Sequence, residues 1–314
     1  MHKEKVMSDP VPVNRAAADH ARLAQALIWL QRIAALSDST SGVLLCGDPA
    51  GARLRILAER GRICFALVPG SGACLIAALI EASGQRIDPA TLRRMFTACQ
   101  KSGESLTSKL VADGYLSERR LRQVLLRHTC EAILGGAIRG QAATWQLGDQ
   151  RGYGARYDFT LSEVWYGMVL CCESQLPARA WEPVSQLTPH EGWALACSSD
   201  GMPLRWVSSA ERARSLQEDM ATAAWMRKVL RAASTIEPGV EEVVFGGGGV
   251  GDAARSTVVW SQGTISYAVH CPTRSDLAIV LRKRSRVSRV LTVEQSGVFD
   301  TVEPTATVRV LRGQ

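Results

Sequence analysis

The stretch GVLLCGDPAGARLRILAERGRICFALV, residues 42–68, decides the fold of the first half of the chain. It contains three short segments of partly alternating apolar residues, at Gly42–Cys46, Arg53–Ala58 and Arg62–Val68. Turn-forming residues separate them, at Asp48-Pro49-Ala50-Gly51 and at Glu59-Arg60-Gly61. An apolar period of two is typical of half-buried strands, so this stretch predicts a three-stranded antiparallel meander.

Helices are predicted on both sides of the meander. Before it, leucines and an alanine recur at spacings of four, three and four within residues 14–36, which places them on one helix face: Leu23, Leu27, Leu30 and Ala34. After it, Gly72–Ala82 reads as a helix, and Asp88-Pro89 is a start signal for another.

A helix-turn-helix is predicted next. Ser105–Ala112 reads as a short helix that ends at Asp113-Gly114, and Ser117 then caps a longer helix. The pair forms a winged-helix-like insert, after which Ala143–Leu147 returns to the sheet and Leu161–Cys172 forms a further helix.

The second half is a separate domain of different order. Prolines at 177, 183 and 189 indicate a linker over residues 173–189. We therefore predict a disordered arm (1–13), a first domain (14–172), a second domain (190–294) and a tail (295–314).

In the second domain, the Asp-Gly turn at Asp200-Gly201 joins Trp193–Cys197 to Pro203–Val207, a strong hairpin signal. The pattern then predicts a helix, three strands and a closing helix, at Ala210–Ala233, Glu241–Phe245, Thr257–Trp260, Ile265–Val269 and Asp276–Leu291. The order β-β-α-β-β-β-α gives a five-stranded sheet flanked by two helices, and the whole chain is predicted to be α+β.

Composition limits the class of protein. The chain has 314 residues, and its net charge of +7 favours acidic partners such as nucleic acid, an anionic membrane or an acidic protein surface. Its longest uncharged stretch, Ile63–Ile80, is broken by Pro69-Gly70-Ser71-Gly72, so no membrane span is expected. No secretory signal is recognisable and the nine cysteines form no C-x-x-C pair, which predicts a cytoplasmic protein with reduced core thiols.

No catalytic or cofactor motif stands out. Gly246–Gly251 matches G-x-G-x-x-G in letters, but Asp252-Ala253-Ala254-Arg255 and a strand follow it where a dinucleotide site needs a helix. We interpret it as a hairpin loop. His128 shares an apolar helix face and reads as a core or rim residue, and no histidine has companions at metal-ligand spacing. We expect no cofactor, no metal and no enzyme activity.

Two basic clusters together form the candidate partner-binding surface. One lies on the predicted last helix and the other on the long helix before it; the candidate partner-binding residues are Arg282, Lys283, Arg284, Arg286, Arg289, Arg227 and Lys228. A solvated helix face and a docking stripe for an acidic partner both fit this pattern. Four arginines along the longer helix of the insert, 119, 120, 122 and 127, suggest DNA binding as an alternative, with Gln123 as the available polar reader of bases.

Both halves resemble known families. Through ESLTSKLVADGYLSERRLRQVLLRH and the surrounding strands, residues 20–172 resemble the bacterial PATAN (DUF4388) family, which implies an interaction domain of signalling proteins often coupled to two-component receivers. Through GWALACSSDGMPLRWV and TISYAVH, residues 188–294 resemble the roadblock/LC7 family, with its roadblock/profilin-like sandwich. That resemblance implies a homodimer formed by sheet pairing and binding of Ras-like small GTPases.

The expected function is therefore that of a bacterial signalling adaptor. It would dimerise and bind a small GTPase or a receiver domain, and would act on nucleotide hydrolysis through the switch loops of the GTPase. A nucleic-acid-binding regulator is the alternative.

Overall fold

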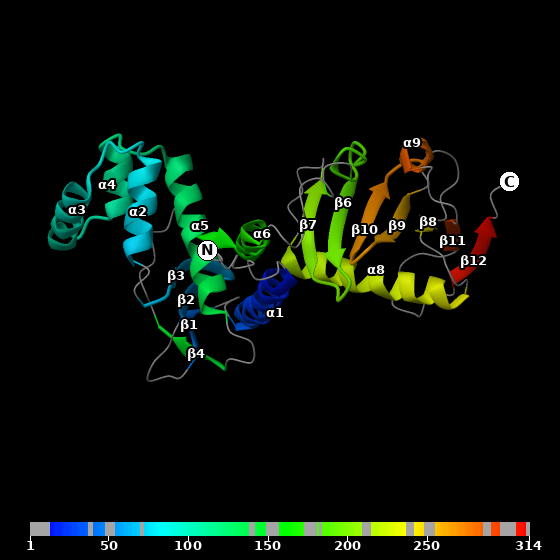
Figure 1. Cartoon of the computed structure of the whole chain (residues 1–314), viewed down its shortest axis with the longest axis horizontal. Coiled ribbons are helices and arrows are strands. Elements are labelled where there is room, and N and C mark those ends of the chain that lie inside the picture. Colours follow the sequence, from blue (N-terminus) through cyan, green and yellow to red (C-terminus); the bar gives the residue numbers. More distant parts are fainter. Residues whose placement is uncertain are drawn as a thin grey trace, which may run out of the picture. The chain divides into compact units, whose positions relative to one another are not determined.

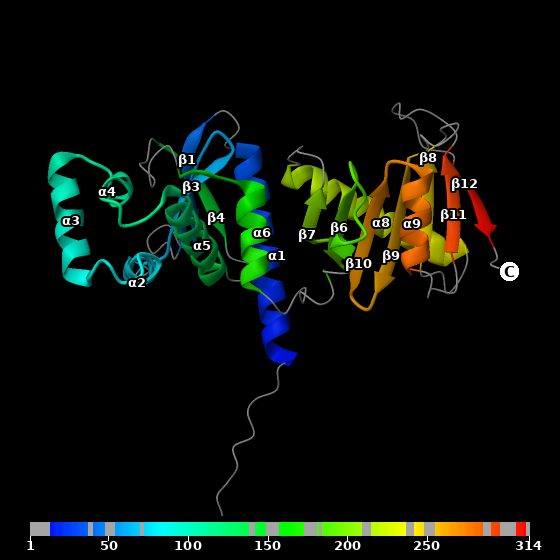
Figure 2. The ribbon, with the colours of Figure 1, turned by 90° about the horizontal axis from the view of Figure 1, so that it is seen from above.

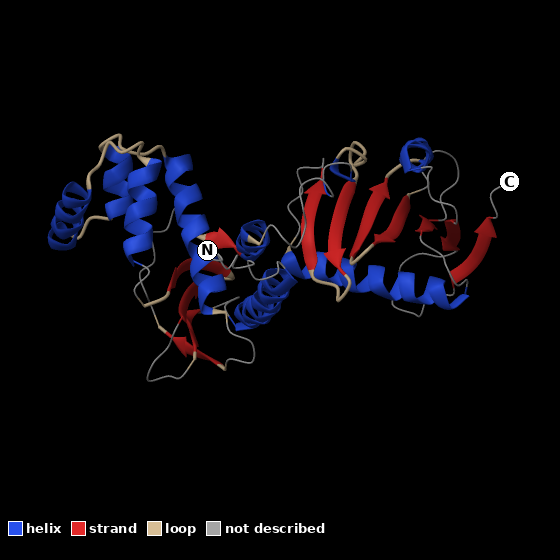
Figure 3. Ribbon diagram, viewed as in Figure 1, coloured by secondary structure: helices blue, strands red, loops and turns tan. Residues whose placement is uncertain are grey.

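The computed structural model describes residues 13–36, 40–47, 54–69, 72–137, 142–148, 157–172, 181, 184–208, 215–236, 242–247, 255–284, 290–295 and 306–311. The chain forms two compact units, Met1–Gln175 and Leu176–Gln314. Their division falls inside the stretch 173–189 predicted as a linker. Each unit combines helices with a sheet, so the prediction of an α+β chain is confirmed (Figure 3).

The sheet of unit 1 has five strands in the order β4-β1-β2-β3-β5, and all its pairs are antiparallel. The strands are β1 (Ser41–Cys46), β2 (Leu54–Glu59), β3 (Arg62–Leu67), β4 (Ala143–Leu147) and β5 (Phe159–Thr160). The predicted meander is thus confirmed, and so is the returning strand, which pairs with β1.

The six helices described in unit 1 are α1 (Val13–Leu36), α2 (Gly72–Ala82), α3 (Pro89–Ser102), α4 (Leu106–Ala112), α5 (Glu118–Gly136) and α6 (Leu161–Cys171). The predicted starts of α3 and α5 are confirmed by caps. The Asp88 carboxylate accepts from the amides of Ala90 at 2.8 Å and Thr91 at 2.9 Å, and the Ser117 hydroxyl accepts from the Arg120 amide at 3.3 Å. Of the predicted arm, Val13 already belongs to α1, and residues 1–12 lie outside the described part of the chain.

Helix α5 is the centre of unit 1. It packs on β2 and β3 and also contacts α1, α2, α4 and α6, whereas α3 contacts only α2 and α4 closely among the described elements (Figures 1 and 2). Its inner side is apolar and buried, with Leu121, Leu125 and Ile133 at no more than 1% exposure. At its end Gly136 lies against Leu54 of β2, where an added Cβ would come within 2.7 Å of the leucine Cβ.

The two neighbouring glycines of α5 give a matched stability test. Gly136→Ala should destabilise unit 1 by roughly 1–3 kcal/mol, because the strand or the helix must move to admit the methyl group. Gly135→Ala should stabilise it by up to about 1 kcal/mol, because a Cβ there meets no described atom within 4 Å and alanine favours helix. Hydrogen exchange of the α5 amides reports on unit 1 alone, and equal shifts in both variants would contradict the packing.

The sheet of unit 2 has seven described strands in the order β12-β11-β8-β9-β10-β6-β7. The elements of this unit are β6 (Trp193–Ser198), β7 (Pro203–Ser208), α8 (Leu216–Ile236), β8 (Glu242–Gly247), β9 (Ser256–Gln262), β10 (Ile265–Cys271), α9 (Arg274–Arg284), β11 (Val290–Gln295) and β12 (Ala306–Leu311). From β6 to α9 the order is the predicted β-β-α-β-β-β-α. The hairpin at Asp200-Gly201 is confirmed, since Gly201 has φ of +90° in the turn.

Helices α8 and α9 cover opposite faces of this sheet (Figures 1 and 2). Ala223 and Met226 of α8 pack on one set of alternating strand residues, among them Leu195 and Val259. Residues of the other parity, such as Trp260 and Tyr267, point to the face where α9 lies, and they are also buried.

Three predictions in unit 2 need correction. The predicted helix over 276–291 ends at Arg284, because Val290–Gln295 is the strand β11, which runs parallel to β8. Its sequence VLTVEQ begins with β-branched and apolar residues, which favour a strand. The predicted tail, 295–314, contains β12, so the sheet is larger than the five strands expected.

The helix predicted from Ala210 is described from Leu216. Ser215 and Glu218 form a reciprocal cap there, in which the Glu218 carboxylate accepts from the Ser215 amide at 2.7 Å and the Ser215 hydroxyl accepts from the Glu218 amide at 3.2 Å. Residues 210–214 lie outside the described ones, and the helix continues beyond Ala233 to Ile236. Among the described helices of both units, none is long and apolar enough to cross a membrane.

The strands β11 and β12 are predicted to keep the chain from self-associating through the edge of its sheet. Both strands follow α9; β11 covers the backbone edge of β8 and β12 pairs with β11, so a chain that lacks residues 285–314 should expose the β8 edge and self-associate. Light scattering should show a mass that rises with protein concentration, while removal of residues 312–314 alone should leave the mass unchanged. A truncated chain with the same mass as the full chain at every concentration would contradict this role.

Candidate functional site

The outer face of α9 carries the predicted basic cluster. Arg282 and Lys283 are exposed, and Ile279, three and four positions before them, is 49% exposed on the same face. Val280 is fully buried, so this residue anchors the helix to the sheet. The backbone of Arg284 ends the helix while its side chain is not described, and Arg286 and Arg289 lie outside the described residues.

The start of α9 is fixed by Thr273. Its hydroxyl donates to the Asp276 carboxylate at 2.7 Å and accepts from the Asp276 amide at 3.1 Å. This local cap explains why the helix begins directly after β10, and it sets which residues face outward.

The second predicted cluster, on α8, belongs to a different surface. Arg227 is partly buried, and its guanidinium donates to the carbonyl of Asp200 in the β6–β7 turn. Lys228 is exposed. Because α8 and α9 lie on opposite faces of the sheet, the structure does not bring these two residues together with Arg282 and Lys283.

The arginines of the insert are only partly available to a partner. Arg122 binds the Glu163 carboxylate at 2.8 Å and the Asp158 carbonyl at 3.2 Å, and it stacks over the Phe159 ring at 4.8 Å. Arg127 binds Glu131 at 2.8 Å. Arg119 and Arg120 are exposed on the first turn of α5, and Gln123 is exposed one turn further on.

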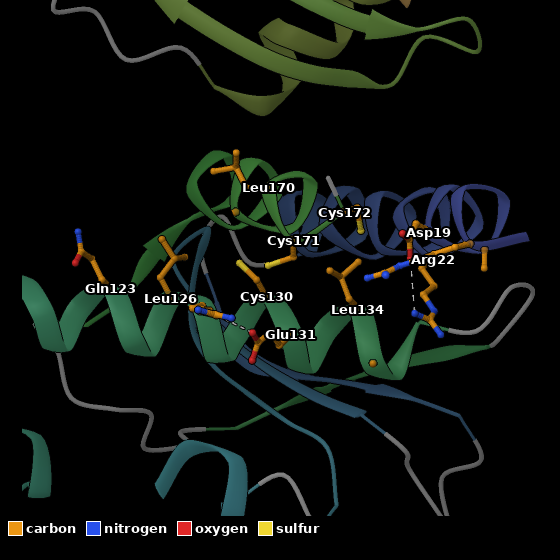
Figure 4. Close-up of a pocket in the computed structure, with 15 residues that line it drawn as sticks. Asp19, Arg22, Gln123, Leu126, Cys130, Glu131, Leu134, Leu170, Cys171 and Cys172 are labelled. Atoms are coloured by element: carbon orange, nitrogen blue, oxygen red, sulfur yellow. Dashed lines mark hydrogen bonds and ion pairs between the residues drawn. The ribbon is translucent and has the colours of Figure 1, made fainter. Parts of the chain in front are cut away.

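An open groove in unit 1 was not predicted from the sequence (Figure 4). It has a volume of about 800 Å³ and lies between α1, α5 and α6. Apolar and small residues line much of it, and charged residues from α1 and α5 complete it; the lining includes Ala18, Leu126, Leu134, Gly167, Leu170 and Cys171. In the structure, Leu170 marks this groove: it is an apolar residue near the end of α6, and it is 56% exposed.

Ion pairs flank the groove. Asp19 and Arg22 of α1 lie 3.8 Å apart, and the pair of Arg127 and Glu131 belongs to α5 (Figure 4). Arg15 of α1 adds a third guanidinium group to the groove. The groove therefore combines an apolar lining with charges from two helices.

Three thiols line the same groove and are poorly suited to nucleophilic chemistry. Burial raises the pKa of Cys171 above its ordinary value and raises the pKa of Cys172 to about 11. Burial also raises the pKa of Cys130 strongly, and its Sγ contacts the Val164 carbonyl at 3.4 Å. Since the thiolate is the nucleophile and the metal ligand, these groups are protonated and unreactive near neutral pH.

The remaining candidates are located as follows. All nine cysteines are free thiols and six are buried, as the sequence predicts. His128 is 5% exposed, which confirms that it is a core or rim residue, and burial lowers its pKa.

The described residues contain no cluster of three or more histidine, cysteine or acidic side chains that could hold a metal. Strand β8 ends at Gly247, and residues 248–254 of the glycine loop lie outside the described part.

Comparisons with known proteins found no match, whether among family models, curated proteins or solved structures. The PATAN and roadblock resemblances therefore stay predictions.

The raised pKa of Cys171 predicts its pH profile. This thiol is exposed, so access does not limit its alkylation, and the rate should follow the thiolate fraction. Because burial raises the pKa of Cys171 above its ordinary value, the rate should keep rising with pH up to about pH 9 without a plateau. Short iodoacetamide pulses and peptide mass spectrometry measure it. A rate that reaches a plateau below pH 8.5 would show a lowered pKa and contradict this prediction.

Proposed function

We propose that this chain is an adaptor that binds an acidic protein surface through the outer face of α9. The observation that carries the proposal is the grouping of the exposed Ile279 with Arg282 and Lys283 on one face of that helix. Protein interfaces combine such an apolar centre with complementary charge, which steers the encounter and selects the partner.

The apolar part gives this surface affinity as well as charge. Full burial of an isoleucine side chain contributes about 1.5–3 kcal/mol. Exposed lysine and arginine side chains add attraction that weakens as salt rises, since ions screen charges beyond about 10 Å at 0.1 M salt. A solvated basic face alone would not need the exposed isoleucine.

The partner we propose is a Ras-like small GTPase or a receiver domain. The support is the roadblock and PATAN resemblance of the sequence, together with the β-β-α-β-β-β-α order from β6 to α9. Dimerisation by sheet pairing would have to use β7 or β12, because these are the edge strands among those described. Any effect on hydrolysis would come from reshaping the GTPase switch loops.

Nucleic-acid binding is the second candidate, and the observation that favours it is the exposure of Arg119 and Arg120 on the first turn of α5. Against it, most of α5 packs inside unit 1, and its outward side forms a wall of the groove between α1 and α6. A recognition helix must present a free face to the major groove.

Charge reversal tests both candidates. The variant Arg282→Glu/Lys283→Glu should lose a GTPase or receiver partner that the wild-type chain retains from a bacterial lysate, because the partner's acidic surface would then be repelled. The variant Arg119→Glu/Arg120→Glu changes net charge equally and should retain this partner. Mass spectrometry of the bound fraction provides the measurement.

The opposite outcome would favour the second candidate. If the wild-type chain recovers nucleic acid, and only the Arg119→Glu/Arg120→Glu variant loses it, the adaptor proposal fails. A partner that both variants retain would also place the contact elsewhere.

A further inference from the structure

We propose that the groove between α1, α5 and α6 binds an acidic amphipathic helix of a partner protein. This surface lies in unit 1 and shares no residue with α9. The inference therefore stands or falls independently of the function proposed for unit 2.

The shape of the groove fits a helix. Its α5 wall is one stripe with helical spacing, formed by Gln123, Leu126, Arg127, Cys130, Glu131, Leu134 and Gly135. Its α1 wall is a second such stripe, formed by Arg15, Ala18, Asp19 and Arg22. From position 123 to 135 a helix rises about 18 Å, which is just over three turns. The exposed members of this stripe are Gln123, Arg127, Glu131 and Gly135, and a partner helix of similar length can lie along them.

The lining can accept apolar side chains. Leu126 and Leu134 of α5 are joined by Ala18 of α1 and by the exposed Leu170 of α6 (Figure 4). At Gly135 an added Cβ would meet no described atom within 4 Å, so space is open at the end of the stripe. Helices that dock in such grooves use apolar residues at i, i+3, i+4 and i+7.

Charge selects an acidic partner. The groove contains three guanidinium groups, from Arg15, Arg22 and Arg127, and two carboxylates, from Asp19 and Glu131. Each carboxylate is already paired with one of the arginines, at 3.8 Å and 2.8 Å. The excess is positive, and guanidinium groups can accept a second carboxylate through their remaining N–H donors.

A peptide selection on the full chain tests the proposal. Display of a random library of 16-residue peptides should enrich sequences that carry acidic residues and the helical apolar pattern. The exposed thiol of Cys171 lies in the groove, and the exposed thiol of Cys74 on α2 does not line it. A bound peptide should slow alkylation of Cys171 severalfold and leave Cys74 unchanged.

Two variants locate the contact. Leu170→Asp and Arg15→Glu change exposed side chains, so the fold should persist, which thermal unfolding checks. Each variant should lower the affinity for the selected peptides about tenfold or more, as measured by fluorescence anisotropy. The variant Arg282→Glu/Lys283→Glu should bind them as the wild-type chain does, which separates this site from α9.

Three results would overturn the inference. The first is that no selected peptide protects Cys171 from alkylation. The second is that the protecting peptides are basic or lack the helical apolar pattern. The third is that only small apolar compounds slow the alkylation of Cys171. Protection of Cys171 that survives both groove variants would also count against it.

Discussion

The close approach of α6 to α5 sets the geometry of unit 1. At Gly167 an added Cβ would come within 2.6 Å of the Cys130 sulfur, so only glycine allows the two helices this separation. The Cys130 thiol also contacts the Val164 carbonyl one turn earlier in α6. With α6 held this close, α5 is covered on one side only in part, and α1 forms the remaining wall. The groove follows from that arrangement.

A comparable constraint acts in unit 2, where the sheet is buried on both faces. Trp260 and Tyr267 stack with centroids 5.3 Å apart on the face of α9, while Trp193 and Trp206 lie 5.3 Å apart on the face of α8. On α9, Val280 is fully buried against the sheet, while Ile279, Arg282 and Lys283 remain at the surface. The outer face of α9 is thus available for binding.

Local features of this fold were predictable from the sequence, and long-range ones were not. The meander follows from alternation and turn residues, and the cap at Asp88 follows from side-chain chemistry within three positions. The end of α9 was predicted too late, because apolar residues at 287 and 291 continue a helical spacing, whereas Val290–Gln295 pairs with the parallel strand β8. Such a partner, more than forty residues away, leaves no local signal.

The groove was hidden for the same reason. Its walls come from residues as far apart as Ala18 and Cys171, and each stripe alone reads as an ordinary helix face. Six of the nine cysteines are buried, as predicted for core thiols, yet Leu170 and Cys171 lie where that core opens to solvent. Exposure of this kind depends on how α1 meets α6, which no short window of sequence contains.

The two proposed surfaces should respond differently to salt, although both combine cations with an exposed aliphatic side chain. In the groove, Arg22 and Arg127 are already paired with Asp19 and Glu131, so Arg15 provides most of the attraction for a partner's carboxylate and apolar burial adds the rest. The face of α9 has no carboxylate on the outer side of its last two described turns, because Asp276 is held at the cap by Thr273. Salt should therefore weaken binding at α9 more than binding in the groove.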